Sequence, residues 1–285
     1  MIGSGDVKIM NCSAIGFNHI KNSLPCQDYS FSYSFKDKTF IAISDGHGGR
    51  QYIRSQEGSK YAVISAFRTL IMLDSKKIDL EINEELIKQI KLNILCSWNH
   101  LVEQDYGNLP FSDDELKDLT EDEKDNLITK PELAYGCTLH ACLIINNLAL
   151  VISIGDGGIF AFNKENLVEL SVDKEENVAN ITDSLCNEEA YQDLSVKVYD
   201  ISSFDAVIAV SDGLVNPYQS YSNFKESFVF PLLETLKKKD GIYEVRHFVK
   251  ELGASKGIGD DVSLSLYYKE QDNDLDGSFS RTKED

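Results

Sequence analysis

Strands and helices follow one another along this chain without a regular alternation. Residues 136–170 carry four short apolar stretches, GCTLHACLII, LALVISIG, GGIFAF and LVEL, with the turn-rich sequences INN, GDGG and NKEN at their junctions. That spacing is typical of an antiparallel meander. A parallel sheet would instead need a crossover connection, usually a helix, between successive strands. The pattern therefore predicts an α+β fold rather than a doubly wound parallel sheet.

The remaining segments show the two periods of regular structure. Residues 29–35 alternate, with Tyr29, Phe31, Tyr33 and Phe35 on one face, and we expect a hairpin with residues 38–44. Apolar residues recur at helical spacing around Trp98, which is expected to be a core residue. In total, further strands are predicted at 7–16, 196–201, 206–211 and 262–268, and helices at 57–73, 84–102, 224–238 and 242–252.

No repeat and no linker divides the chain. We therefore predict a single domain over residues 1–270. An insert at about residues 104–132, which contains FSDDELKDLTEDEKD, is crowded with carboxylates. It is expected to form a solvated helix pair, with a mobile lid near a functional site as the alternative. The polar residues 271–285 are expected to be a disordered tail.

The net charge of −19 limits the partners of the chain. It argues against nonspecific binding to nucleic acid or to an anionic membrane surface. No apolar run reaches the ~18 residues of a spanning helix, and no secretory signal is visible. The 6 cysteines are scattered without a CxxC pair, so we expect no zinc site, buried free thiols and a cytoplasmic location.

Several aspartates stand where an apolar strand meets a glycine-containing turn. Asp45 follows FIAIS, Asp156 follows LVISIG, Asp212 follows AVIAVS, and Asp260 and Asp261 precede VSLSLYY. A carboxylate there is held by the strand and open to solvent, which suits a hard divalent cation. The alternative for each is a turn residue chosen for its backbone preferences. Spacing alone leaves both interpretations open.

The order of these motifs resembles a known family. SDGHGG (44–49), GCT with ISIGDGG (136–158), VSDG (210–213) and GDDVS (259–263) are similar to motifs of the metal-dependent protein phosphatases of type 2C, in a divergent bacterial branch. PCQDYS (25–30) and RSQEGSKYA (54–62) resemble the stretches that flank the first metal aspartate. The resemblance covers about residues 10–268. It implies two antiparallel sheets packed as a sandwich, with helices outside and a metal cleft at one edge.

The resemblance also implies roles for individual residues. Asp45 would bridge two Mn²⁺ or Mg²⁺ ions, and the Gly46 carbonyl would bind one of them. Asp212 and Asp260 would complete the shell of the first ion. Asp28 would serve the second ion, directly or through water.

Three further positions follow from the same comparison. Asp156 corresponds to an aspartate that helps to hold a weaker third ion in several members. Asp261 would support the site without binding metal, because the family pattern favours the first aspartate of the pair. Gln27 stands where some members carry glutamate, so that shell would depend more on water.

The implied activity is hydrolysis of phosphoserine and phosphothreonine in proteins. A water bridging two cations would attack phosphorus in line, without a covalent enzyme intermediate. His47, beside the first metal aspartate, matches the general acid that protonates the leaving alkoxide. A phosphoprotein substrate, a partner serine/threonine kinase among them, and a monomeric chain are expected.

One departure from the family concerns the phosphate. Many members place an arginine shortly before the acidic motif, and the aligned position here is near Ser23. Lys21, His19, Arg50 and Arg54 are the candidate replacements, each also interpretable as an ordinary surface residue. Two alternatives therefore stay open: a phosphatase-like binding module with little or no turnover, and a hydrolase of nucleotides or other small phosphoesters.

Overall fold

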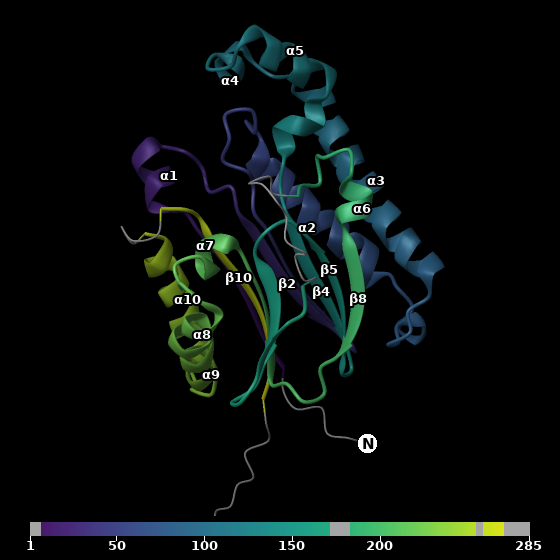
Figure 1. Cartoon of the computed structure of the whole chain (residues 1–285), viewed down its shortest axis with the longest axis vertical. Helices are drawn as coiled ribbons and strands as arrows, with labels where there is room; N and C mark the ends of the chain where they lie inside the picture. The colour runs from purple at the N-terminus through teal and green to yellow at the C-terminus, as the bar shows by residue number, and fades with distance from the viewer. Residues whose placement is uncertain (1–6, 172–182, 255–258, 271–285) are drawn as a thin grey trace, which may run out of the picture.

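Two five-stranded antiparallel sheets face each other in the computed structural model, which describes residues 7–171, 183–254 and 259–270. Helices cover the outer face of each sheet (Figure 1). The expected α+β sandwich is therefore confirmed. The predicted tail at 271–285 lies outside the described residues. No helix in the described ranges is long and apolar enough to cross a membrane.

The first sheet joins the two ends of the described chain. Its order is β1-β10-β9-β6-β7, so the first and last strands are neighbours. Ala14 pairs with Val262 at one end of the β1–β10 ladder, and Val7 pairs with Lys269 at the other. The strands are β1 (Val7–Ala14), β10 (Val262–Lys269), β9 (Ala206–Val210), β6 (Gly158–Phe162) and β7 (Leu167–Glu169).

The second sheet has the order β2-β3-β4-β5-β8. The predicted hairpin is present, with Tyr29 opposite Ser44 and Phe35 opposite Lys38. The rings of Phe31 and Tyr33 pack edge-on against Phe67 of a covering helix. The strands are β2 (Tyr29–Phe35), β3 (Lys38–Ser44), β4 (Leu139–Ile145), β5 (Leu148–Ile154) and β8 (Ser195–Asp200).

Central strands are buried on both faces. In β3, Ile41 and Ile43 enter the core between the sheets, whereas Phe40 and Ala42 face the helices. In β9, the inward Val207 alternates with outward residues of the second outer core. Because both faces of these strands are buried, their sequences are continuous apolar runs and do not alternate between apolar and polar residues.

The predicted four-strand meander is wrong in one respect. β4 and β5 form a hairpin in the second sheet, but β6 and β7 form theirs in the first. The chain changes sheets at the GDGG sequence, where Gly155 and Gly157 have φ of 92° and 91°. Glycine takes this left-handed conformation without a Cβ penalty, which permits the sharp corner. Asp156 is thereby held at the edge of the sandwich.

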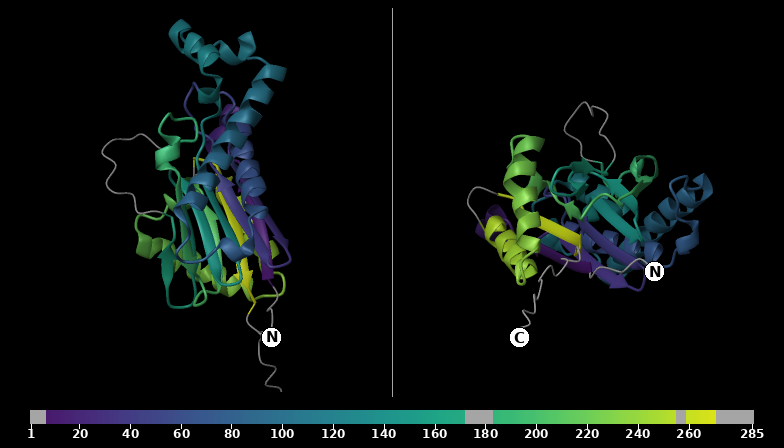
Figure 2. Two further views of the ribbon diagram at one scale, coloured as in Figure 1. Left: turned by 90° about the vertical axis from the view of Figure 1, so that its right-hand side faces the viewer. Right: turned by 90° about the horizontal axis from the view of Figure 1, so that it is seen from below.

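Two helical layers flank the sheets (Figure 2). α2 and α3 cover the second sheet, and Trp98 of α3 is fully buried with its indole N–H bonded to the Gly58 carbonyl at 3.0 Å. α3 runs six residues beyond the predicted end at Val102. The helices here are α2 (Ser55–Ile71), η1 (Ser75–Lys77), α3 (Glu84–Asn108), α4 (Asp113–Leu116), α5 (Glu121–Thr129), η2 (Pro131–Tyr135) and α6 (Ala190–Asp193).

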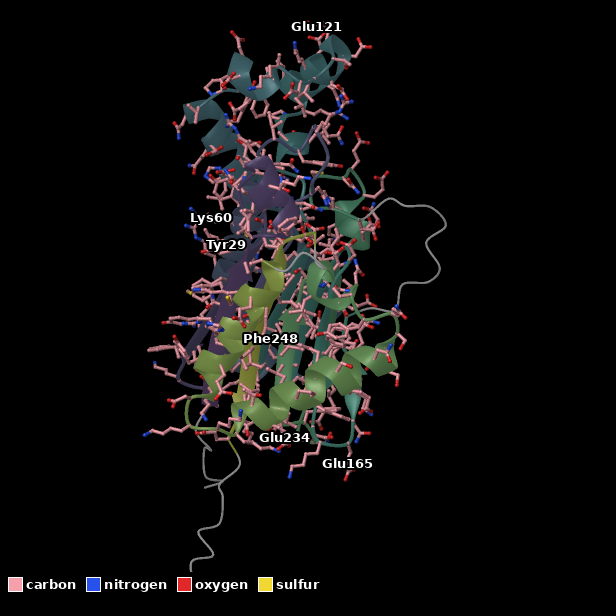
Figure 3. All side chains as sticks on the ribbon, turned by 90° about the vertical axis from the view of Figure 1, so that its left-hand side faces the viewer. Tyr29, Lys60, Glu121, Glu165, Glu234 and Phe248 are labelled. Carbon is pink, nitrogen blue, oxygen red and sulfur yellow. The ribbon has the colours of Figure 1, made fainter. Side chains whose placement is uncertain are left out.

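The other layer covers the first sheet, and its last helix spans Gly241–Gly253. Figure 3 shows Phe248 on this helix and Glu121 at the far tip of α5. The segment predicted as one helix from Phe224 to Lys238 is helical without interruption over residues 221–236, with a π-helical stretch between two α-helical ones. Its elements are α7 (Asp212–Val215), α8 (Tyr221–Phe224), η3 (Lys225–Val229), α9 (Phe230–Leu236) and α10 (Gly241–Gly253). The short helix α1 (Phe17–Asn22) was not predicted.

The cysteines differ in exposure. Cys12, Cys137, Cys142 and Cys186 are buried, as expected, but Cys26 is half-buried and Cys96 is exposed. All of them are free thiols.

Candidate active site

Carboxylates from both sheets meet at one edge of the sandwich. Asp45 directly follows β3, Asp212 follows β9 at the start of α7, and Asp28 directly precedes β2. Burial raises the pKa of Asp45 well above its usual range, and the nearby charges of Asp28, Asp212 and Asp260 raise it further. Four predicted site residues therefore lie within electrostatic reach of one another.

Asp156 belongs to the same group. Burial raises the pKa of Asp212, and the charges of Asp156 and Asp260 add to the effect. Asp156 also acts on His47, because its charge raises the pKa of that imidazole while burial lowers it more strongly. The sheet change at GDGG thus brings the fifth predicted carboxylate to the cluster.

Two carboxylates of this cluster contain buried oxygens with no donor in hydrogen-bonding geometry, namely both oxygens of Asp28 and Oδ1 of Asp212. Burial raises the pKa of Asp28 to about 8 and the Asp261 charge adds to this effect, while the nearby hydroxyls of Ser263 and Ser211 oppose it. Among the described residues, no lysine or arginine forms an ion pair with Asp28, Asp45, Asp212 or Asp260. Buried charges of one sign without partners are costly, and hard cations are suited to oxygen donors of this kind. The residues therefore fit divalent cations.

The side chains do not yet form a closed cage. Within the parts of the chain that the structure covers, no three His, Cys, Asp or Glu side chains are arranged so that they could hold a metal ion as they stand. The cluster is a set of facing carboxylates. Carboxylate side chains that still have solvent on one side can reach a cation by rotamer changes, since exposed rotamers interconvert readily.

The turn that carries Gly46 is fixed by its backbone. The Asp45 carbonyl accepts a hydrogen bond from the Thr138 amide at 2.9 Å, and the His47 amide donates to the Gly136 carbonyl at 3.0 Å. A Cβ atom at Gly46 would stand 2.7 Å from the Gln27 carbonyl oxygen. Glycine is therefore required here, because the β2 entry loop and the α2 start pack directly against the backbone.

Asp260 and Asp261 have different surroundings. Asp261 is 2% exposed, and its two oxygens accept hydrogen bonds from the amides of Gly16 and Gln27, each at 2.6 Å. His19 Nδ1 lies 3.0 Å from the same carboxylate. Asp260 is exposed, and its only hydrogen bond in the described structure comes from the Asp261 amide at 2.9 Å. Asp261 is committed to the backbone, whereas Asp260 is available to a ligand.

His47 lies beside the carboxylates and is half-buried. Its ring packs against Tyr52, with ring centroids 4.9 Å apart. A lower pKa makes the imidazolium a stronger acid, and the neighbouring Asp156 charge opposes this shift. The ring is thus positioned at the cluster and tuned by it.

The four candidate replacements for the phosphate-binding arginine separate clearly. Both predicted interpretations of Arg54, as a phosphate ligand and as a surface residue, are wrong. Its side chain is buried, with 4% of the residue exposed, and it donates hydrogen bonds to Glu115 and Asp105. His19 is paired with Asp261. Lys21 is exposed on α1, and Arg50 has a side chain 70% exposed with Glu123 at 3.6 Å. Of the four, only Lys21 and Arg50 are exposed to solvent.

Sequence reasoning did not assign His140. This residue is fully buried in β4, with Nδ1 2.8 Å from the Ser153 hydroxyl and Nε2 2.5 Å from the Asp156 carbonyl. It supports the turn that presents Asp156. A polar residue inside the apolar run LHACLII is the sequence signal that could have identified it.

A family model described as protein phosphatase 2C matches residues 15–252. The chain belongs to the protein phosphatase 2C family. The match spans both sheets and includes Asp28, Asp45, Asp156 and Asp212, while Asp260 lies beyond its end. The expectation drawn from the order of the motifs is therefore confirmed.

Solved structures share the fold of this phosphatase 2C family member at low identity. Stp1 from Staphylococcus aureus, a serine/threonine phosphatase, aligns with a TM-score of 0.61 and 13% identity over 95% of this chain and 98% of that one. PppA, a regulatory component of a secretion system in Pseudomonas aeruginosa, aligns with a TM-score of 0.59 and 18% identity over 93% and 99%.

A third solved structure contains metal. The catalytic domain of the serine/threonine phosphatase PstP, in complex with two manganese ions, aligns with a TM-score of 0.55 and 18% identity over 92% of this chain and 97% of that one. At such identities the alignments show the fold alone. No curated protein matches the chain.

Proposed function

We propose that this chain is a metal-dependent phosphatase of phosphoserine and phosphothreonine in proteins. One observation carries the proposal: five carboxylates from both sheets lie close enough to act on one another's charge, and neither Asp28 nor Asp212 has a lysine or arginine to offset it. A cluster of this kind destabilises the folded chain unless cations offset it. The family supports phosphoester hydrolysis as the chemistry.

Two divalent ions, Mn²⁺ or Mg²⁺, are the proposed cofactors. Asp45 and the Gly46 carbonyl would hold them together with Asp212 and Asp260 on one side and Asp28 on the other. Asp156 would hold a weaker third ion. When bound, the cations supply the positive charge and Lewis acidity that a phosphate dianion needs in a chain of net charge −19. The manganese ions of the PstP structure support this choice.

The protein residues themselves perform two tasks. His47, which lies beside Asp156 and the other carboxylates, donates a proton to the departing seryl or threonyl oxygen. Asp261 fixes the amides of Gly16 and Gln27 and so positions the loop that leads to Asp28. Phosphate binding falls to the cations with Lys21 or Arg50, because Arg54 and His19 are engaged elsewhere.

Residues 1–270 would act as one catalytic unit. Its substrates would be phosphoproteins, partner serine/threonine kinases among them. A cytoplasmic location fits the free thiols of all 6 cysteines.

The deciding experiment is hydrolysis of a phosphothreonine peptide with EDTA, Mg²⁺ or Mn²⁺. We expect turnover only with added metal, and we expect Asp45→Asn to lower kcat/KM at least about a thousandfold, since it removes the proposed bridging carboxylate. Asp118→Asn, an exposed aspartate of the insert, is the matched control and should retain wild-type activity.

Other results would redirect the assignment. Wild-type turnover by Asp45→Asn would refute the metal-site assignment. Folded wild-type protein without turnover under any metal would indicate a phosphatase-like binding module, with Ser23 at the arginine position as its cause. Preference for a free nucleotide over the peptide would indicate a small-molecule phosphoesterase.

A further inference from the structure

A cavity of about 390 Å³ opens directly beside the carboxylate cluster. Asp156 and Asp212 form its wall on the site side, and Glu169 at the end of β7 belongs to the lining as well. The volume lies in the lower part of the range of small-ligand pockets. A group bound here would be adjacent to the reacting phosphate.

Aromatic rings make up much of the remaining wall. Phe160 and Phe224 have centroids 5.3 Å apart, and Tyr218 packs edge-on against Phe224 at 5.4 Å. Tyr221 lies 6.3 Å from Phe160 and its hydroxyl donates to the Leu167 carbonyl at 2.8 Å. The rings are therefore held in place, although Tyr221 remains 47% exposed.

The charge of the cavity is entirely negative. None of the described residues that line it is Lys, Arg or His. If Asp156 and Asp212 are engaged by cations, Glu169 is the carboxylate left for a ligand. Glu169 is exposed and accepts a hydrogen bond from the Ser171 hydroxyl at 2.7 Å, which orients it. Glu169 and Tyr221 line the same cavity, and burial raises the pKa of Tyr221, with the charge of Glu169 adding to the effect.

A carboxylate beside fixed aromatic rings is a recognition pattern for cations. A guanidinium or ammonium group is attracted to the faces of the rings and pairs with the carboxylate. The cavity shares Asp156 and Asp212 with the cluster, so a side chain near the phosphoresidue of a bound peptide would be next to the cavity while the phosphate is at the cluster. The net charge of −19 favours a basic substrate in general.

We propose that this cavity binds an arginine or lysine side chain that flanks the phosphoresidue, so that the enzyme selects basic phosphopeptides. This inference rests on the proposed phosphatase function and specifies its substrate class. Glu169 supplies the charge and Tyr221 supplies the ring face. Selection should act mainly on KM, because the contact is made before and during the reaction alike.

The test uses phosphothreonine peptides with alanine flanks and a single arginine moved through positions −4 to +4. We expect about a tenfold higher kcat/KM for arginine at one or two positions, which suits a cation–π contact joined to an exposed ion pair. Replacing that arginine by citrulline, which keeps the shape without the charge, should remove the gain.

Matched variants locate the effect. Glu169→Gln should equalise kcat/KM for the arginine and alanine peptides, whereas Glu165→Gln, at an exposed glutamate that does not line the cavity, should preserve the wild-type ratio of these two values. Tyr221→Leu should lower the ratio severalfold, and Tyr221→Phe, which keeps the ring, should retain most of it. An unchanged ratio in Glu169→Gln, or a leucine peptide preferred over the arginine peptide, would overturn the inference.

A binding measurement separates the two proposals. Fluorescence anisotropy with the unphosphorylated arginine and alanine peptides does not need turnover, and we expect wild type but not Glu169→Gln to prefer arginine. Hydrolysis without any arginine preference would remove only the cavity assignment. An arginine preference in binding without hydrolysis would preserve the cavity assignment and remove the phosphatase.

Discussion

Arg54 connects several segments of the chain through a single side chain. Its guanidinium bonds to Glu115 at 2.8 Å, to Asp105 at 3.2 Å and to the Tyr135 hydroxyl at 2.9 Å. It also donates to the Leu109 carbonyl at 2.7 Å. These groups come from α3, the loop after it, α4 and η2, so one side chain attaches the acidic insert to the start of α2. Arg54 can make these hydrogen bonds at the same time because a guanidinium group carries five N–H donors in one plane.

Replacement of Arg54 should therefore destabilise the whole domain. We expect Arg54→Met to lower the free energy of unfolding by about 3 kcal/mol, because Asp105 and Tyr135 would lose a buried cationic partner. The measurement is the urea midpoint. Arg50→Met, at an exposed arginine whose nearest carboxylate is 3.6 Å away, should change it by less than about 0.5 kcal/mol.

The same contact gives a dependence on pH. The hydrogen bond from Arg54 lowers the pKa of Glu115 from 4.5 to about 2. Because the pKa in the folded state is the lower one, this stabilisation is complete above pH 4.5 and is lost as the pH falls through about 2. The difference in free energy of unfolding between wild type and Arg54→Met should therefore become smaller as the pH falls from 4.5 to about 2. A difference that does not change with pH would contradict the contact between Arg54 and Glu115.

At the scale of elements, α2 packs unusually close to the segment that leads into β4. A Cβ atom at Gly58 would stand 1.9 Å from the Tyr135 carbonyl oxygen, and the Gly58 carbonyl accepts the indole N–H of Trp98. The glycine thus lets α2, α3 and η2 meet at one point. The close approach also fixes Gly136 and Cys137, which hold the Asp45 turn.

The close approach predicts opposite effects of one substitution at two helical glycines. Gly58→Ala should destabilise the domain by at least about 2 kcal/mol, since backbone atoms would have to move apart. Gly107→Ala, in α3 with nothing within 4 Å of the added Cβ, should stabilise it by about 0.5–1 kcal/mol. Thermal unfolding of both variants checks the pair, and a neutral Gly58→Ala would exclude the tight packing.

At the scale of the whole molecule, three cores build a rigid sandwich whose edge carries like charges. One core lies between the sheets, and each sheet packs its other face against helices. The carboxylate cluster stands where strands of both sheets end, so its repulsion acts across the sandwich. The helices α4 and α5 project at the same end as α1 and α7 (Figures 1 and 2). If the proposed cations bind at this edge, they should stabilise the fold by offsetting the repulsion.

Metal should stabilise the folded protein even without substrate. At a concentration of Mn²⁺ about 100-fold above its dissociation constant we expect about 2.7 kcal/mol, or a rise in Tm of roughly 5–10 °C relative to EDTA. In Asp45→Asn, added Mn²⁺ should raise Tm much less than in wild type. In EDTA, the Tm of this variant should equal or exceed that of wild type, because one of the repelling charges has been removed. Equal shifts in both proteins would show that Mn²⁺ binds elsewhere.

Most of the regular elements and the family could be predicted from the sequence alone. Period-2 and helical patterns located most strands and the helices α2, α3 and α10, because these preferences are set by neighbouring residues. The position of Asp45, Asp156 and Asp212 at strand ends was equally readable, since each follows an apolar run directly.

Tertiary structure decided which partners those residues have. The residues near β6 do not show that this strand leaves the sheet of β5. Nor do the residues near Asp260 and Asp261 show that it is Asp261 that accepts a hydrogen bond from the amide of Gly16, 245 residues away. Arg54 resembled a surface residue until the insert 61 residues later supplied Glu115. Long-range pairing depends on the summed packing of the whole chain, so it cannot be deduced from a window of sequence.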